Sequence, residues 1–316
     1  MSKSIKVVMT IVAICLTLGT VLACIGASFG GMRSLWFDAR HGLTIDNGPS
    51  FTEEKYVVSE PETVNRIRVS AAACSLRFVE GDELSVYYEY NDRFFLGCEC
   101  TVTGDTLDVN LTPRSVSNLK MPLFNLGWNF SEFTALVTIA YPRGTVFESI
   151  DINVDAAAIE LGTLYAKDIN LTFTATQVNA DLLFCDNLNL KVAASDLNFY
   201  KVSAKESAVL DMDAGQLNIS QANLPDTNIS IDAGEVTIAG QLTGDCQIRM
   251  SVGNLELSLN QPQADFRFVY KVEVGHFSVN DISVENLSAS NSQGWGSGSQ
   301  TIDVRVQVGS VSIKTR

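Results

Sequence analysis

The feature that most constrains this chain is an alternating apolar pattern that breaks at a small residue, resumes and then recurs. In DMDAGQLNIS, residues 211–220, apolar and polar residues alternate up to Ala214. The phase slips by one residue at Gly215, and the alternation then continues. SIDAGEVTIA, residues 230–239, repeats the phrase 19 residues later. Each copy therefore predicts two short strands that meet at a corner, where a side chain would crowd the bend.

The phrase recurs at a nearly fixed period. Between Asp155 and Ser251 the equivalent position returns after 19, 19, 20, 19 and 19 residues, and nine copies occur between Ile67 and Ile313. A strand-type pattern with this period is typical of a solenoid, because each copy is too small to bury its apolar side alone. The sequence predicts an all-β fold, a β-solenoid of the single-stranded β-helix or β-roll type with about 19–20 residues per coil. In the copy at 230–239 the residues expected to point inward are Ile231, Ala233, Val236 and Ile238.

The beginning of the chain departs from the strand pattern. Residues 7–32 carry no charged side chain, and a helix that spans a bilayer needs roughly 20 residues. Lys3 and Lys6 precede this stretch, which predicts a cytoplasmic N-terminus and an extracytoplasmic remainder. The solenoid is therefore expected to be preceded by one N-terminal transmembrane helix, a signal anchor at 5–32.

Two other interpretations of this segment remain open. VLAC, which ends at Cys24, resembles a lipoprotein signal in which the thiol would be acylated, although leucine two residues before the cysteine matches imperfectly. A cleaved secretory signal is the other alternative, but its apolar core is usually shorter. The length favours the uncleaved anchor.

The rest of the chain divides by pattern. Residues 1–4 are expected to be a cytoplasmic stub, and residues 33–62, with mixed charge and an Asn-Gly-Pro, to be a linker. Residues 63–316 form the predicted β-strand-repeat ectodomain. Within it, 63–148 is irregular with hairpin-like strands, and 149–316 carries the regular repeats.

An apolar loop, residues 113–133, interrupts the irregular part. It is expected either to cap the solenoid, which solenoids require, or to contact a partner or the outer leaflet of the membrane. The residues that would make such a contact are Leu123, Phe124, Trp128 and Phe130.

Composition excludes several functions. With 22 Lys and Arg against 36 Asp and Glu, the formal net charge is −14, which makes nucleic acid an unsuitable partner. Two histidines, His41 and His276, are too few for a convincing metal site or catalytic triad. The cysteines after the anchor are scattered, which favours small buried thiols over a disulfide framework. No catalytic residue, cofactor or metal ligand is predicted.

Outward carboxylates do recur in the repeats. Asp155, Asp213 and Asp232 occupy the same place in three copies, so a ladder that binds Ca²⁺ is one interpretation. The copies between the first two carry Thr174 and Ala193 there. A polar solvated face is therefore the better interpretation.

Several stretches together resemble a known family. They are an apolar segment ending in IGASFGG, then IRVSAAACSLRFVEGDELSVYYE, LDVNL, AYPRGTVFESIDIN and serial DAG repeats. The chain is similar here to the bacterial β-strand-repeat family of "putative adhesins", membrane-anchored envelope proteins of unassigned function. The resemblance covers 64–316 and the anchor. It implies a β-helix or β-roll and brings no catalytic residues with it.

Three functions follow as hypotheses. The first is a membrane-anchored, extracytoplasmic protein with a binding or structural role at the cell envelope, adhesin-like and not catalytic. Its partners would be the lipid bilayer, through 5–32, and a cell-surface, glycan or membrane-protein ligand. The alternative is an envelope-stress sensor or regulatory accessory protein that acts through a membrane partner. A polysaccharide-active β-helix enzyme is the third, disfavoured by the acidic surface.

Overall fold

The computed structural model describes residues 35–38, 42–45, 51–92, 94–114, 120–122, 135–280, 282–286 and 293–316. Within these residues the chain is all-β: it contains strands and two three-residue 3-10 turns, η1 (Pro61–Thr63) and η4 (Gln263–Asp265). No helix in the described ranges is long and apolar enough to cross a membrane. The predicted anchor at 5–32 and Cys24 lie outside the described residues, so the transmembrane helix stays a prediction.

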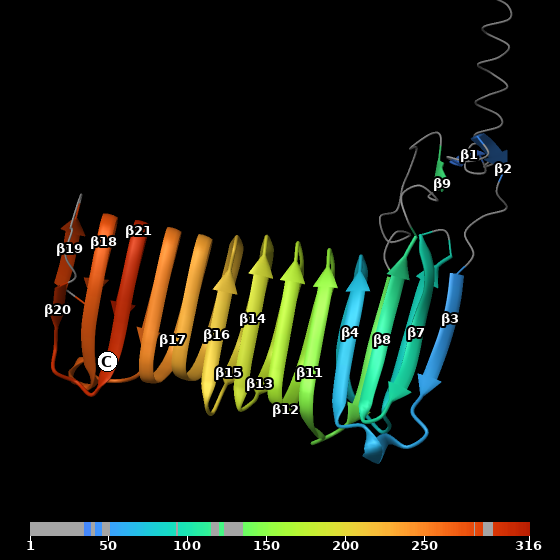
Figure 1. Ribbon diagram of the computed structural model, residues 1–316, viewed down its shortest axis with the longest axis horizontal. Helices are drawn as coiled ribbons and strands as arrows, with labels where there is room; N and C mark the ends of the chain where they lie inside the picture. Colours follow the sequence, from blue (N-terminus) through green and yellow to red (C-terminus); the bar gives the residue numbers. More distant parts are fainter. Residues whose placement is uncertain are drawn as a thin grey trace, which may run out of the picture.

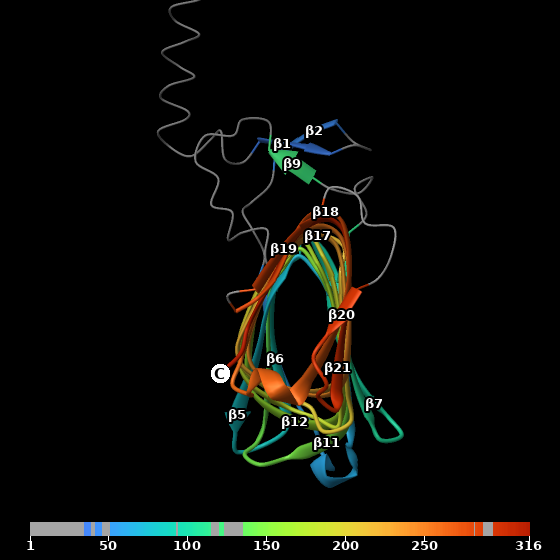
Figure 2. The same ribbon diagram turned by 90° about the vertical axis from the view of Figure 1, so that its left-hand side faces the viewer.

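The strands stack into a rod with two β faces joined by tight corners (Figure 1). Viewed along the rod, the coils superimpose on one another (Figure 2). Strands that enter the corners form face A: β8 (Thr106–Pro113), β4 (Arg66–Ala72), β11 (Val146–Asp155), the second half of β12 (Ala158–Thr174), β14 (Asn187–Ala193) and β16 (Ser207–Met212). Strands that leave them form face B: β10 (Ala135–Pro142), β5 (Cys74–Gly81), the first half of β12, β13 (Gln177–Phe184) and β15 (Ser195–Ser203). Besides β12, three bent strands contribute to both faces: β17 (Gly215–Leu259), β18 (Phe266–Val279) and β21 (Gln300–Lys314).

Adjacent coils pair in parallel and in register. On face A, Ile150 pairs with Ile169, and Ile169 pairs with Leu188. On face B, Val178 pairs with Leu197 one repeat later. The 19-residue period is therefore one coil of the rod, as the sequence pattern predicts.

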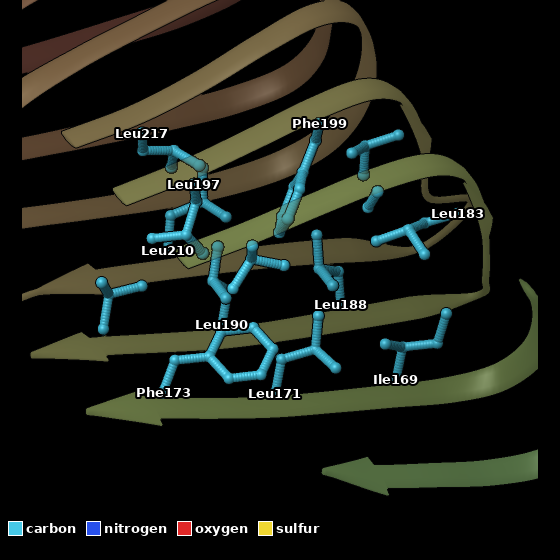
Figure 3. Packing of buried hydrophobic residues seen from close by; sticks show 14 of the residues in the cluster. Ile169, Leu171, Phe173, Leu183, Leu188, Leu190, Leu197, Phe199, Leu210 and Leu217 are labelled. Carbon is cyan, nitrogen blue, oxygen red and sulfur yellow. The ribbon is translucent and has the colours of Figure 1, made fainter. Parts of the chain in front are cut away.

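The core lies between the two faces and runs the length of the rod as one cluster of buried side chains. Because each coil repeats the same inward positions, like residues stack on like, as Leu171 and Leu190 do beneath Leu210 (Figure 3). All three are at most 2% exposed. Burying each such side chain contributes about 1.5–3 kcal/mol, so stability comes from stacking the copies.

The corners form a line along one edge of the rod, which we call the crest. Each coil places one alanine or valine there: Ala73, Ala156, Ala175, Ala194, Ala214, Ala233, Val252, Val308 or Val274. The turn takes two forms. In four coils the crest alanine itself has a positive φ, as at Ala175 (φ 52), whereas in the others the following glycine does, as at Gly253 (φ 151).

Of the four residues predicted to point inward in the copy at 230–239, the one on the crest does not. Ile231, Val236 and Ile238 are buried as expected, with at most 1% exposure. Ala233 is exposed instead, and Val252, its counterpart one coil later, is 52% exposed. The reason is that the chain has already begun to turn at this position, so strict alternation no longer holds and the side chain points away from the rod.

The predicted linker at 33–62 also needs correction, because it contains three strands: β1 (Leu35–Asp38), β2 (Gly42–Ile45) and β3 (Phe51–Val57). β3 pairs antiparallel with β6 (Ser85–Asn91) at the end of face B, while β7 (Phe95–Thr103) pairs antiparallel with β8 at the end of face A. In β3 only Thr52 and Tyr56 are even half-buried. An edge strand of this kind shows little apolar alternation, which explains why the sequence did not reveal it.

The other end of the rod is built out of sequence order. β21 lies between the last coil of β17 and β18, paired in parallel with both. Two antiparallel strands, β19 (Ile282–Asn286) and β20 (Gln293–Trp295), pair with the far side of β18. The Trp295 ring contacts Phe268 and Phe277 with ring centroids 5.8 and 6.2 Å away, and so closes the core at this end.

Candidate binding surface

The predicted contact residues Leu123, Phe124, Trp128 and Phe130 lie outside the described residues. The described part of their loop is β9 (Lys120–Pro122), which pairs antiparallel with β1. Together with β2 these strands form a three-stranded sheet that lies beyond the crest (Figures 1 and 2). The loop at 113–133 therefore replaces a tight corner: it leaves face A where β8 ends and returns where β10 begins on face B.

The recurring carboxylates do not assemble into a metal site in the part of the chain that the structure describes, where no group of three or more His, Cys, Asp or Glu could hold an ion. Asp155 is followed by Thr174 on the next strand. Asp232 accepts a hydrogen bond of 3.4 Å from Ser251 Oγ. These side chains belong to a polar outer surface.

The arrangement best suited to a ligand is on face B, where a row of polar side chains crosses adjacent strands. Asn179 pairs with Asn198, and Asn198 with Asn218, so the three amides stand side by side on β13, β15 and β17. All three are exposed. On the preceding strands the row continues with Glu160 and Arg77, which form an ion pair at 2.9 Å. The row presents hydrogen-bond donors and acceptors at the strand spacing of about 4.8 Å.

A second row runs beside the first and contains both a notch and an aromatic ring. Gly162, Asp181 and Tyr200 occupy equivalent places in three successive coils. Gly162 leaves a notch of about 500 Å³, lined also by Val79 and Asn179. A Cβ at Gly162 would approach Phe78 O to 2.9 Å, so the backbone packs too closely for any side chain.

The floor of the notch is held by a buried tyrosine. The Tyr141 hydroxyl donates a hydrogen bond of 2.6 Å to Thr163 O, next to Gly162. Burial raises the pKa of Tyr141 above its ordinary value, so the hydroxyl stays a donor at neutral pH. At the rim, Glu80 accepts from Arg143 Nε at 2.9 Å. This contact raises the pKa of the Arg143 guanidinium.

The aromatic side of the surface is Tyr200, which is 55% exposed. Its hydroxyl accepts a hydrogen bond of 3.1 Å from Gln221 Nε2. Nearby, Phe184 stacks on Tyr165 with centroids 5.0 Å apart, and Lys201 Nζ lies 5.4 Å from the Phe184 centroid. An exposed ring with one apolar face and adjacent polar groups suits a ligand that is itself apolar on one face and hydroxylated at its edge.

We call Asn179, Asn198, Asn218, Asp181, Tyr200 and the Gly162 notch the face B platform. Residues 162, 181 and 200 are spaced 19 residues apart, so the coil period alone could have predicted that they lie side by side. Nothing in the pattern distinguished this row from other outward rows, because the notch depends on how closely Gly162 approaches Phe78 O.

The fold defines a class: parallel β-solenoid repeat proteins in which each coil is one 19- or 20-residue arch. A family model described as Toastrack DUF4097 matches residues 64–314. The chain therefore belongs to the Toastrack DUF4097 family, which confirms the family resemblance seen in the sequence. No curated protein is similar enough to count as a relative.

Solved structures that match this chain include three bacterial proteins. A "putative adhesin" from Bacteroides fragilis is 16% identical, with 84% of this chain and 97% of that chain covered and a TM-score of 0.46. A "putative cell adhesion protein" from Clostridium sporogenes is 14% identical, with 84% and 100% covered and a TM-score of 0.24. A "putative lipid binding protein" from Parabacteroides distasonis is 11% identical, with 84% and 97% covered and a TM-score of 0.31.

Proposed function

We propose that this protein is an adhesin-like, non-catalytic binding protein of the bacterial cell envelope, and that it binds a glycan on the face B platform. The observation that carries this proposal is the exposed Tyr200 ring beside the amide row that includes Asn198. Sugar rings offer an apolar face for stacking and edge hydroxyls for amides and carboxylates. A flat, rigid face of stacked strands suits an extended polymer better than a small molecule, which would call for a deep enclosed pocket.

Membrane attachment is part of the proposal and rests on the sequence. The apolar segment at 5–32 would hold the protein in the bacterial cell membrane, with a single pass, the N-terminus cytoplasmic and the rod extracytoplasmic. β1 and β2 follow that segment in the chain and lie on the crest side of the rod (Figure 1). In this arrangement the crest side would be nearest the membrane, leaving the face B platform open to a ligand.

A second function is favoured by a specific contact. β9, from the loop at 113–133, pairs with β1, which follows the predicted anchor directly. A ligand or partner held by this loop would therefore act on the segment that enters the membrane. This contact supports the alternative of an envelope-stress sensor or regulatory accessory protein working through a membrane partner.

The test of the first function is glycan binding by the full-length protein in detergent. Tyr200→Ala and Asn198→Ala should each weaken binding by about tenfold, the equivalent of roughly 1.4 kcal/mol. Phe51→Ala is the matched control, because Phe51 is also an exposed aromatic, 48% accessible, but lies at the end of the rod. Binding that is indifferent to both platform substitutions would contradict the proposal. Loss of a membrane-protein partner on deletion of 113–133, with glycan binding intact, would favour the alternative.

A further inference from the structure

The out-of-order insertion of β21 brings three cations together on face A. Arg249 of β17 pairs in register with Arg305 of β21, and Arg305 pairs with Lys271 of β18. Arg249 and Arg305 are exposed, and Lys271 is half-exposed. Adjacent strands lie about 4.8 Å apart, so three positive side chains cover about 10 Å along the rod. We call Arg249, Arg305 and Lys271 the basic row.

We propose that the basic row is a binding site for a polyanionic chain that carries phosphate or carboxylate groups. This site is separate from the face B platform, because it lies on the opposite face and takes a ligand of different chemistry. It does not rest on the proposed glycan binding.

The first argument is the contrast with the other cations of the rod. Elsewhere a cation usually faces a carboxylate on a neighbouring strand. Examples are Arg68 with Asp108 at 3.1 Å, and Arg77 with Glu160 at 2.9 Å. In the basic row the neighbour across the strand is another cation, and like charges placed opposite each other destabilise a sheet. The arrangement therefore has an electrostatic cost, and packing of the core does not require a cation at any of these three outward positions.

The second argument concerns the partners that the basic row does have. Arg305 pairs with Asp303 at 3.1 Å, and Lys271 with Glu273 at 3.5 Å, in each case two residues away on the same strand. Exposed pairs of this kind are worth only about 0–1 kcal/mol, so an incoming oxyanion displaces them readily. Arg249 donates to the Gln247 amide oxygen at 3.2 Å. Among the described residues no carboxylate lies within ion-pair distance of Arg249.

The third argument is the chemistry and shape of the row. The planar guanidinium of arginine matches phosphate and carboxylate oxygens through two parallel hydrogen bonds. The row is open and runs along the rod, so one small anion would gain little from it. A chain with repeated charges engages several cations at once and gains by multivalency. The formal net charge of −14 opposes polyanion binding to the molecule as a whole, so the attraction has to come from the basic row itself.

The test measures binding of inorganic polyphosphate and of polygalacturonate to the full-length protein in detergent. Arg305→Gln removes the middle cation and should weaken binding by about tenfold, the equivalent of roughly 1.4 kcal/mol. Arg305→Lys keeps the charge but not the planar fork and should lose less. The wild-type affinity should fall with salt, with a log–log slope of about −2 for three contacts.

Lys314→Gln is the matched control, because it removes one positive charge from the same strand. Lys314 lies in the part of β21 that belongs to face B, where it forms an ion pair with Glu256. Binding that survives Lys314→Gln but is lost in Arg305→Gln supports the site, provided that both variants melt near the wild-type temperature. Equal affinity of the wild type, Arg305→Gln and Lys314→Gln, or no binding of either polymer to the wild type, would overturn the proposal. Anionic phosphatidylglycerol vesicles form a separate arm, and binding to vesicles alone would overturn the polymer assignment.

Discussion

Replacing Gly253 with alanine tests the physical basis of the stacked corners. Gly253 has a φ of 151°, which L side chains rarely adopt. A Cβ built there would lie 2.2 Å from Gly234 O and 3.1 Å from Gly234 N. Both contacts are to backbone, so they cannot be relieved by rotating a side chain. The two coils would have to move apart.

The size of the effect follows from two costs. Holding a residue with a side chain in this region of φ costs about 1–3 kcal/mol, and forcing extra atoms into a packed site costs about 1–3 kcal/mol. The lower conformational entropy of the unfolded alanine chain returns about 0.4–1 kcal/mol. The net destabilisation is therefore about 3 kcal/mol, which corresponds to a fall in melting temperature of roughly 6–12 °C at 2–4 °C per kcal/mol.

Ala175→Gly is the matched substitution in the opposite direction. Ala175 occupies the crest with a φ of 52° and is exposed, so its methyl group packs against nothing in the core. Glycine would relieve about 1–2 kcal/mol of left-handed strain and would lose about 0.5–1 kcal/mol through the flexibility of the unfolded chain. Its stability should stay within about 1 kcal/mol of the wild type.

The assay is thermal and urea unfolding of the two variants side by side. Hydrogen exchange on the coils either side of 253 complements it, because solenoid coils lose stability locally. If Gly253→Ala melts with the wild type, or if both variants lose equal stability, the two corner types are not physically different and the reasoning fails.

Two further predictions concern buried polar and ionisable groups. Ser195→Ala should destabilise the rod by about 1–3 kcal/mol in urea unfolding, because Ser195 Oγ accepts a hydrogen bond of 3.0 Å from the buried backbone N–H of Thr176. An unchanged unfolding midpoint would show that water replaces the lost hydroxyl as the acceptor. Burial raises the pKa of the Cys74, Cys185 and Cys246 thiols from 9.0 to about 12. The unfolded chain releases these protons first, so stability should fall between pH 9 and 12 by up to about 1.4 kcal/mol per pH unit per thiol. Replacing all three with alanine should flatten that slope in denaturation series, and an equally steep slope would assign the loss to other groups.

The regular coils could be predicted because one physical rule governs them. Inward residues such as Ile231 and Ile238 repeat at the coil period, and the period alone fixes which backbones pair. Ala233 could not be placed by the same rule, because alternation assumes an extended chain and the turn begins one residue before the glycine. β3 was missed for a related reason: its side chains are largely exposed, so no apolar rhythm marks it as a strand.

The candidate surfaces were less predictable than the fold. The sequence places Asn179 and Asn198 one period apart, so the amide row follows from counting. The notch depends on a backbone approach at Gly162 that no pattern reports. The basic row depends on which strands are neighbours in space. Counting repeats puts Lys271 after Arg249 and leaves Arg305 at the end, whereas the structure puts Arg305 between them.

The side chains of β18 and β21 give a physical reason why β21 lies inside β18 although it follows β18 in the chain. β18 carries Phe268 and Phe277, whose rings pack against Trp295 at the closed end of the rod. β21 offers Ile302 and Val311 at the positions that pair with these two phenylalanines. Aromatic rings also lie inside the stack, as Phe173 and Phe199 do. What distinguishes β18 is the Trp295 ring, which covers its aromatic side chains at the end of the rod. The contact with Trp295 therefore favours β18 as the end coil and leaves β21 as the inner one, which places the outward Arg305 between two other cations.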